Sequence, residues 1–187
     1  MSEVAAKETV AEAGDGPKPV RIGLLGRGTV GAAFAELLAE RAEAVQAATG
    51  RRPELAGVLT RSDGDFAEIL ERSDLVVELM GGTEPAREYA IAAMRAGKPF
   101  VTANKQLLAQ HGDELFQVAR ESGVQLRFEA AVAAVIPIVR TIQEGFAATE
   151  IEKVYGIVNG TTNFILSEMA STGAGYDDVL ARAQELG

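Results

Sequence analysis

The sequence lacks cysteine and tryptophan and has a single histidine among its 187 residues. Without cysteine it can form no disulfide, no thiolate nucleophile and no cysteine-ligated metal site, which fits a reducing compartment. No apolar run approaches the roughly 20 residues that a membrane helix needs. No basic segment followed by an apolar stretch stands near the N-terminus. These absences predict a cytoplasmic protein that does not enter the membrane.

Positive charge is also scarce, because 18 Lys and Arg residues face 27 Asp and Glu residues and give a formal net charge of −9. An acidic surface repels phosphate backbones and anionic lipid. No local basic cluster offsets it, so we expect no nucleic-acid partner and no membrane partner. What remains is an ordinary globular composition, 47% hydrophobic and 24% charged, at a length that suits one domain or one domain plus part of another.

Short apolar runs alternate with amphipathic segments from Val20 onward. Such alternation implies right-handed crossovers and a mainly parallel sheet covered on both faces. Residues 1–18 show no sustained apolar period and are expected to form a disordered tail. The pattern therefore predicts an α/β fold, a Rossmann-like doubly wound domain over residues 19–131. Its expected strands are 20–25, 55–60, 75–80, 100–102 and 124–130, and its expected helices follow residue 31 and span 65–72, 84–96 and 104–121.

Local signals mark both ends of one of these helices, and another has a glycine inside it. Thr83 can cap the helix at 84–96, Pro85 suits its first turn and Gly97 suits its exit. The helix at 104–121 is expected to be one helix or two, interrupted near Gly112.

The alternation ends after Ala131. Helices are expected at 136–144, 161–171 and 176–186, with one strand at 152–158. An isolated strand leaves its backbone groups without partners. We therefore expect residues 132–187 to form an incomplete α+β second domain, and we expect a homodimer to complete its sheet.

A glycine-rich loop joins the first expected strand to the helix that follows. In a G-x-G-x-x-G loop the first glycine permits a tight turn, the second lets a pyrophosphate approach the backbone, and the third lets the helix pack closely on the strand. The helix N-terminus then offers free N–H groups to the phosphates. The bare hexapeptide is also compatible with a simple turn, but its position predicts a dinucleotide site at Gly26, Arg27, Gly28, Thr29, Val30 and Gly31.

The end of the second strand bears on the choice of dinucleotide. An acidic side chain there would accept the ribose 2′-hydroxyl of NAD and repel a 2′-phosphate. Arg61 stands at this place, which favours NADP(H), while Asp63 nearby leaves NAD(H) possible. The alternative is that Arg61 is an exposed loop cation.

Two further segments follow the third and fourth strands, at the carboxyl edge where ligands of open parallel sheets bind. Gly81 and Gly82 can line the nicotinamide side of a site or simply form a turn. Lys105 can orient a carboxylate or carbonyl, or transfer a proton if burial lowers its pKa. Alternatively, it is a surface lysine at the start of a helix.

Polar residues in the rest of the chain leave similar alternatives. Glu129 ends the fifth strand in an apolar segment, so it needs a cation or several donors unless it points outward. Residues 159–163 are rich in hydroxyl and amide groups, which can bind a small polar substrate or cap a helix at Thr161. His111 has no ligand spacing to another histidine and is expected to be a loop residue.

Five segments of the chain carry a family resemblance: GLLGRGTVG (23–31), LVVELMGGTEPA (75–86), VTANKQLLAQHG (101–112), FEAAVAAVIPIVRTIQEG (128–145) and GIVNGTTNFILSEM (156–169). Together they resemble the homoserine dehydrogenase family, and the resemblance spans residues 21–187. It implies the NAD(P)-dependent interconversion of L-aspartate 4-semialdehyde and L-homoserine, on the route to threonine and methionine.

The resemblance also implies roles for particular residues. A monovalent cation, usually sodium, would lie at the Glu129 side chain and the carbonyls of Val132, Ala134 and Ile136, and hard cations do prefer oxygen ligands. Lys105 would reach both cofactor and substrate, and Gly187 of the second domain would close over the cofactor. The cofactor contacts that the resemblance implies are Gly26, Thr29, Val30, Arg61, Gly81, Gly82, Lys105 and Gly187.

The sequence departs from the family pattern in three ways. Ala134-Val135 stands where many relatives have Gly-Gly, which reduces backbone freedom at the cation site. The segment between the second and third strands is short. The chain also stops before the second lysine of the family, so we expect it to be inactive alone. Two other functions stay open, namely a different semialdehyde or amino-acid dehydrogenase and a non-catalytic nucleotide-binding module.

Overall fold

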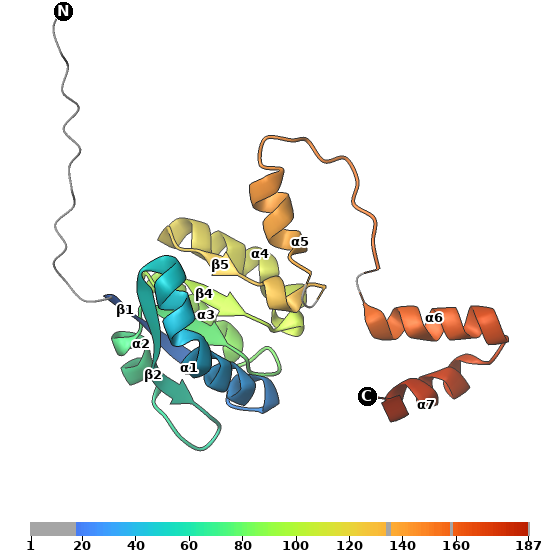
Figure 1. Cartoon of the computed structure of the whole chain (residues 1–187), viewed down its shortest axis with the longest axis horizontal. Helices are drawn as coiled ribbons and strands as arrows, with labels where there is room; N and C mark the ends of the chain where they lie inside the picture. The colour runs from blue at the N-terminus through green and yellow to red at the C-terminus, as the bar shows by residue number, and fades with distance from the viewer. Residues whose placement is uncertain (1–17, 134–135, 158, 187) are drawn as a thin grey trace, which may run out of the picture. The chain divides into compact units, whose positions relative to one another are not determined.

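The computed structural model describes residues 18–133, 136–157 and 159–186. Up to Arg127 its strands and helices alternate as the sequence predicts (Figure 1). The strands form one sheet in the order β2-β1-β3-β4-β5, and the pairs β1–β2 and β4–β5 are parallel. The expected α/β, Rossmann-like class is confirmed. The elements are β1 (Lys18–Leu25), α1 (Thr29–Thr49), β2 (Arg51–Leu59), α2 (Phe66–Arg72), β3 (Leu75–Glu78), α3 (Ala86–Arg95), β4 (Phe100–Thr102), α4 (Lys105–Ser122) and β5 (Leu126–Arg127).

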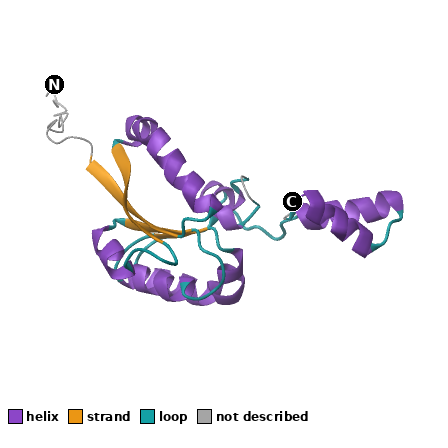
Figure 2. Ribbon diagram, turned by 90° about the horizontal axis from the view of Figure 1, so that it is seen from below, coloured by secondary structure: helices purple, strands orange, loops and turns teal. Residues whose placement is uncertain are grey.

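The chain divides into two compact units, one ending at Val76 and one beginning at Val77. In the first unit, α1 and α2 cover opposite faces of β1 and β2, and Figure 2 shows helices on both sides of these strands. Gly23 and Gly57 are paired across β1 and β2. A Cβ atom on either glycine would approach an Ile69 side-chain carbon of α2 within 3.0 Å. The two glycines therefore let α2 lie close to the sheet.

In the second unit, α3 and α4 pack together beside β4. The fully buried side chains there include Met94, Phe100, Leu107 and Leu115. Burying an aliphatic or aromatic side chain of this size contributes about 1.5–3 kcal/mol. The guanidinium of Arg87 on α3 donates to a carboxylate on α4, so charge as well as packing joins the two helices.

The helix α4 is continuous, although a break near Gly112 was one expectation. Its N-cap is Asn104, whose side chain accepts from the Leu107 N–H at 3.0 Å. Gly123 ends the helix with φ of 65°. Gly112 is buried in the helix interior, and His111 is likewise helical, so the expectation of a loop histidine is wrong.

The remaining elements follow β5. They are a 3-10 turn (Glu129–Ala131), α5 (Ile138–Arg140), a π-helical turn (Thr141–Gly145), α6 (Gly160–Thr172) and α7 (Tyr176–Leu186). The helices α6 and α7 pack through Ile165, Val179 and Ala183. They confirm the helices expected at 161–171 and 176–186.

Other expectations about elements are wrong in detail. The described residues 150–157 contain no strand, and Val154, Tyr155 and Ile157 are exposed there. A strand forms only where a partner strand accepts its hydrogen bonds, and none pairs with this segment in the described chain. Residue 158 lies outside the described residues. Likewise β5 ends at Arg127, and Glu129 begins the 3-10 turn instead of ending a strand.

The expected helix caps also differ from the structure. Pro85, not Thr83, occupies the N-cap of α3, and the Thr83 carbonyl accepts from the Arg87 N–H at 2.8 Å. Asn159, not Thr161, caps α6 by accepting from the Thr162 N–H at 2.8 Å. Of the expected tail, residues 1–17 lie outside the described residues, whereas residue 18 already belongs to β1. The expected domain boundary at residue 131 stays a prediction. Across the described ranges, no helix combines the length and the apolar character needed to cross a membrane.

Candidate functional site

The glycine loop of the first unit is held by close backbone contacts. Gly26 has φ of 98°, and its N–H donates to the Leu59 carbonyl at the end of β2 at 2.8 Å. A Cβ atom at Gly31 would lie 2.0 Å from the Gly26 carbonyl oxygen. Only glycine fits at residue 31, and α1 therefore begins directly against the turn.

The N-terminus of α1 is open to a ligand. Gly28 is its N-cap, no side chain caps it within the described chain, and its first turn contains no acidic residue. A Cβ atom at Gly28 would meet nothing within 4 Å, so packing does not explain this glycine. Arg27, Thr29 and Val30 are exposed beside it. Uncapped N–H groups and the helix dipole favour an anion such as a pyrophosphate at this place.

The loop after β2 contains Arg61 and Asp63, and Asp63 forms hydrogen bonds within the loop. The Thr60 N–H donates to the Asp63 carbonyl at 2.8 Å, and the Asp63 carboxylate accepts from the Gly64 N–H at 2.9 Å. Arg61 is exposed in the same loop. The acidic group here thus already has a partner in its own loop, whereas the cation faces solvent.

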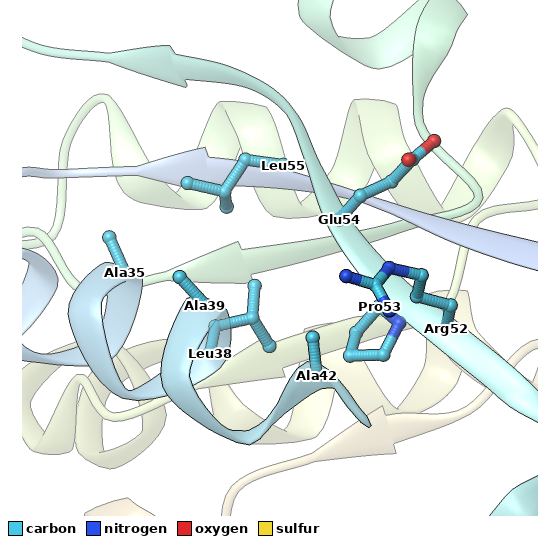
Figure 3. A pocket seen from close by; sticks show the side chains of 8 residues that line it. All are labelled: Ala35, Leu38, Ala39, Ala42, Arg52, Pro53, Glu54 and Leu55. Carbon is cyan, nitrogen blue, oxygen red and sulfur yellow. The ribbon is translucent and has the colours of Figure 1, made fainter. Parts of the chain in front are cut away.

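A hollow of about 330 Å³ lies elsewhere in the first unit, between α1 and β2. Figure 3 shows Leu38 and three alanine methyl groups of α1 facing β2, while Glu54 points away from them. None of the residues that line it was singled out by the sequence. Its lining is mostly aliphatic, so it lacks the convergent polar groups of a dinucleotide site.

The second unit contains a buried polar group where β3 and β4 end, formed by Glu78, Thr102 and Asn104, which we call the strand-end cluster. All three are buried, with 0%, 0% and 6% of their surface exposed. The Thr102 hydroxyl donates to Glu78 Oε2 at 2.5 Å and accepts from the Asn104 N–H at 2.9 Å. Glu78 Oε1 accepts from the Met80 N–H at 2.6 Å.

The strand-end cluster connects two segments that the sequence singled out, the Gly81–Gly82 turn and the start of α4 at Lys105. The Asn104 side-chain amide donates to the Gly82 carbonyl at 2.6 Å, and its oxygen caps α4. Lys105 is the first residue of that helix and is exposed. The structure therefore joins the Gly81–Gly82 turn to the start of α4 through Asn104.

Burial raises the pKa of the Glu78 carboxyl, and hydrogen bonds from Thr102, the Met80 N–H and Asn104 oppose this rise. Sequence reasoning missed Glu78. The available signal was a charged residue inside the apolar run LVVELM, because a buried carboxylate requires partners.

The carboxylate of Glu129 has two donors. Its oxygens accept from the Val139 and Arg140 N–H groups at the start of α5, each at 3.0 Å. These donors answer the expectation that Glu129 needs partners, and each carboxylate oxygen keeps a lone pair for a cation.

The other expected cation ligands are less defined. The Ile136 carbonyl accepts from the Ile138 N–H at 2.8 Å, Val132 follows the 3-10 turn, and Ala134 lies outside the described residues. The described residues contain no group of three or more His, Cys, Asp or Glu side chains that could hold a metal. Gly187, expected to close over the cofactor, also lies outside the described residues.

Comparisons with known proteins point to one family for two consecutive parts of the chain. A family model described as "Homoserine dehydrogenase, NAD binding domain" matches residues 26–129, and one described as "Homoserine dehydrogenase" matches residues 137–187. The homoserine dehydrogenase of Neisseria gonorrhoeae is 44% identical over 185 residues, covering 91% of this chain and 42% of that protein. The chain thus spans less than half the length of this curated relative.

Solved structures of the same family are similar to this chain. The structure of a homoserine dehydrogenase from Thiobacillus denitrificans matches with a TM-score of 0.82 and 43% identity, covering 91% of this chain and 43% of that one. A hyperthermophilic archaeal homoserine dehydrogenase in complex with NADPH matches with a TM-score of 0.78 and 27% identity, covering 90% and 61%. Because the model of the NAD-binding domain alone matches more than half of the residues, the chain belongs to the homoserine dehydrogenase family.

Proposed function

We propose that this chain binds a nicotinamide dinucleotide for the homoserine dehydrogenase reaction, the interconversion of L-aspartate 4-semialdehyde and L-homoserine in threonine and methionine biosynthesis. The uncapped N-terminus of α1 behind the glycine loop carries this proposal. An open Gly28, a Gly31 that tolerates no side chain and a first turn without acidic residues together fit a diphosphate bound by backbone N–H groups.

The proposed contacts divide along the cofactor. Residues 26–31 bind the diphosphate, whereas Gly81 and Gly82 line the nicotinamide side. When bound, the dinucleotide supplies or accepts the hydride. The ammonium group of Lys105 orients the carbonyl of the semialdehyde or gives a proton to the alkoxide oxygen that develops there. Gly187 is proposed to close over the cofactor.

NADP(H) is the proposed preference, with NAD(H) as the second cofactor. Arg61 is exposed in the loop after β2, and Asp63 is hydrogen-bonded within the same loop. A guanidinium forms strong, charge-assisted hydrogen bonds with phosphate oxygens. This loop therefore supports binding of the phosphorylated ribose.

A sodium ion, a homodimer and a cytoplasmic location complete the proposal. The spare lone pairs of Glu129 fit one ligand of a monovalent cation, with Val132, Ala134 and Ile136 offering carbonyl oxygens. The exposed side chains of residues 154, 155 and 157 support a second copy of the chain as the partner that covers them. The small-molecule substrate remains the only other proposed partner.

Titration of the chain with NADPH, followed by nicotinamide fluorescence, tests cofactor binding. In Gly28→Val the new side chain occupies open space, so the fold persists while the approach of the diphosphate is blocked, and affinity should fall at least about tenfold. Gly156→Val is the matched control, because a Cβ atom there also meets nothing within 4 Å. It should bind as the unaltered chain does. No binding of NADPH or NADH at high micromolar protein would contradict the proposal.

The reaction itself is tested by the reduction of NADP⁺ with L-homoserine. The assay uses a chain extended to the length of the Neisseria gonorrhoeae relative, alongside a panel of other amino-alcohol substrates. Turnover of a different substrate would support another dehydrogenase. Binding without any turnover would support a non-catalytic nucleotide-binding module.

A further inference from the structure

Glu78 has no role in the proposed chemistry. It is nevertheless a fully buried carboxyl group, and it lies shortly before Gly81 and Gly82, which do have a proposed role. Burying such a group costs free energy unless hydrogen bonds match it. It is the last residue of β3 after three aliphatic residues, of which Val76 and Val77 are buried as well. An apolar residue would suit this strand better unless the carboxylate performs a task.

The two oxygens of Glu78 connect the chain segments that leave two neighbouring strands. One oxygen accepts from the Met80 N–H, in the segment that leads from β3 to Gly81 and Gly82. The other accepts from the Thr102 hydroxyl at the end of β4. The Glu78 side chain thereby holds both the segment after β3 and the end of β4 in place.

Thr102 passes this connection to the start of α4. Its hydroxyl donates its only proton to Glu78 and accepts from the Asn104 N–H at 2.9 Å. Asn104 in turn holds the Gly82 carbonyl and caps α4. The orientation of Asn104 therefore depends on the Glu78 carboxylate. Through Asn104, the positions of the Gly81–Gly82 turn and of the start of α4 depend on it as well.

A glutamine cannot replace Glu78 in this arrangement, although its size is the same. The carboxylate accepts from the Thr102 hydroxyl, the Met80 N–H and Asn104, and the Met80 N–H can only donate. A glutamine offers one acceptor and one donor group. If its oxygen serves the Met80 N–H, its NH₂ group faces the Thr102 hydroxyl, whose proton then loses its acceptor. The strand-end cluster thus specifically requires two acceptor oxygens at residue 78.

We propose that Glu78 is a positioning residue for the nicotinamide half of the cofactor site, acting through Thr102 and Asn104 on the Gly81–Gly82 turn and on Lys105. The inference rests on the proposed function, in which this turn and Lys105 contact the nicotinamide half. Loss of the carboxylate lets both segments leave the conformation that binds. The apparent dissociation constant then rises in inverse proportion to the fraction of molecules that remain competent.

The test compares the whole cofactor with the same molecule lacking nicotinamide. Calorimetric titration of the 187-residue chain and of Glu78→Gln uses NADPH and 2′-phospho-ADP-ribose as ligands. If the competent fraction falls to about a tenth, NADPH binding weakens about tenfold, while the fragment, held by the glycine loop, stays within about twofold. A purely structural role of Glu78 would weaken both ligands together through loss of folded protein.

Ser73→Ala is the matched control. Its hydroxyl is also fully buried and donates to the Ile69 carbonyl at 2.6 Å, so its loss removes one buried hydrogen bond from the first unit. Ser73→Ala should lower the thermal midpoint of unfolding. It should not change the ratio of the affinities for NADPH and 2′-phospho-ADP-ribose. If Glu78→Gln does not fold, Thr102→Val tests the same connection, and Thr102→Ser, which keeps the hydroxyl, should restore NADPH binding.

Three results would overturn the proposal. The first is unchanged NADPH affinity in Glu78→Gln and Thr102→Val. The second is equal weakening of NADPH and the fragment in these variants. Both leave the proposed function standing, because the unaltered chain still binds the cofactor. The third is failure of the unaltered chain to bind either ligand, which overturns the proposed function as well.

Discussion

The glycine loop and the strand-end cluster position their surroundings by opposite means. The loop depends on side chains that are missing, since Gly31 would place a Cβ atom 2.0 Å from the Gly26 carbonyl oxygen. The strand-end cluster depends on side chains that are present, since Glu78, Thr102 and Asn104 satisfy one another while buried. One region is fixed by steric exclusion and the other by matched hydrogen bonds.

This difference predicts different responses to substitution. Steric exclusion is all or none, because an added methyl group either fits or moves the backbone. Hydrogen-bond matching is graded, because a mismatched group costs on the order of 1–3 kcal/mol and water or a rotated hydroxyl recovers part of it.

The largest effect is expected for Gly31→Ala. Its methyl group must displace either the loop or the start of α1, so we expect a loss of about 3 kcal/mol in the free energy of unfolding together with loss of NADPH binding. Urea unfolding followed by circular dichroism measures the first effect, and fluorescence titration measures the second.

Gly112→Ala is its control, because it makes the same change in the buried interior of another helix. A Cβ atom at Gly112 would have the Phe116 ring as its neighbour at 3.9 Å, an ordinary contact. Alanine is the better helix former by up to about 1 kcal/mol, so this variant should be more stable. Equal losses in both variants would contradict the steric explanation of Gly31.

A smaller effect is expected for Arg61→Ala, which removes an exposed side chain from the loop after β2. Because one charge-assisted contact with the 2′-phosphate is lost, NADPH affinity should fall about tenfold while NADH affinity changes less than about twofold. Parallel titrations with the two cofactors measure the ratio. An unchanged ratio would show that Arg61 is only an exposed loop cation.

The sequence predicts the glycine loop far better than the strand-end cluster, for a physical reason. A steric requirement leaves its mark within six consecutive residues, from Gly26 to Gly31. The partners Glu78 and Thr102 lie 24 residues apart, and only the pairing of β3 with β4 brings them together. Glu78 therefore reads as one polar residue in an apolar strand until the sheet order is known.

The same distinction explains the errors in the strands and helix ends. β1 and β2 begin earlier than their apolar runs because each pairs with the other from Lys18 and Arg51 onward. The strand expected at 152–158 has suitable residues, but no partner strand lies beside its described residues. Alternation of helices and strands is a local property and was predicted, whereas strand ends and isolated strands depend on pairing.

The smallest predicted effect is the dependence of stability on pH, which should differ in sign between the buried Glu78 and the ion-paired Glu114. Burial raises the pKa of Glu78 above its usual value of 4.5, so the folded state binds this proton more tightly than the unfolded chain does. The stability that Glu78 contributes is full below pH 4.5 and declines as the pH rises through its folded-state pKa. The stability of the unaltered chain relative to Glu78→Gln should therefore fall with rising pH, as urea unfolding at a series of pH values measures.

Glu114 supplies the comparison of opposite sign. Its hydrogen bond with Arg87 lowers the pKa of this partly exposed carboxyl, so its contribution is present above the usual pKa and is lost as the pH falls. The stability of the unaltered chain relative to Glu114→Gln should rise with pH, by a small amount because solvent screens an exposed pair. Parallel slopes in the two variants would mean that Glu78 is stabilised in its charged form, with its donors outweighing the cost of burial.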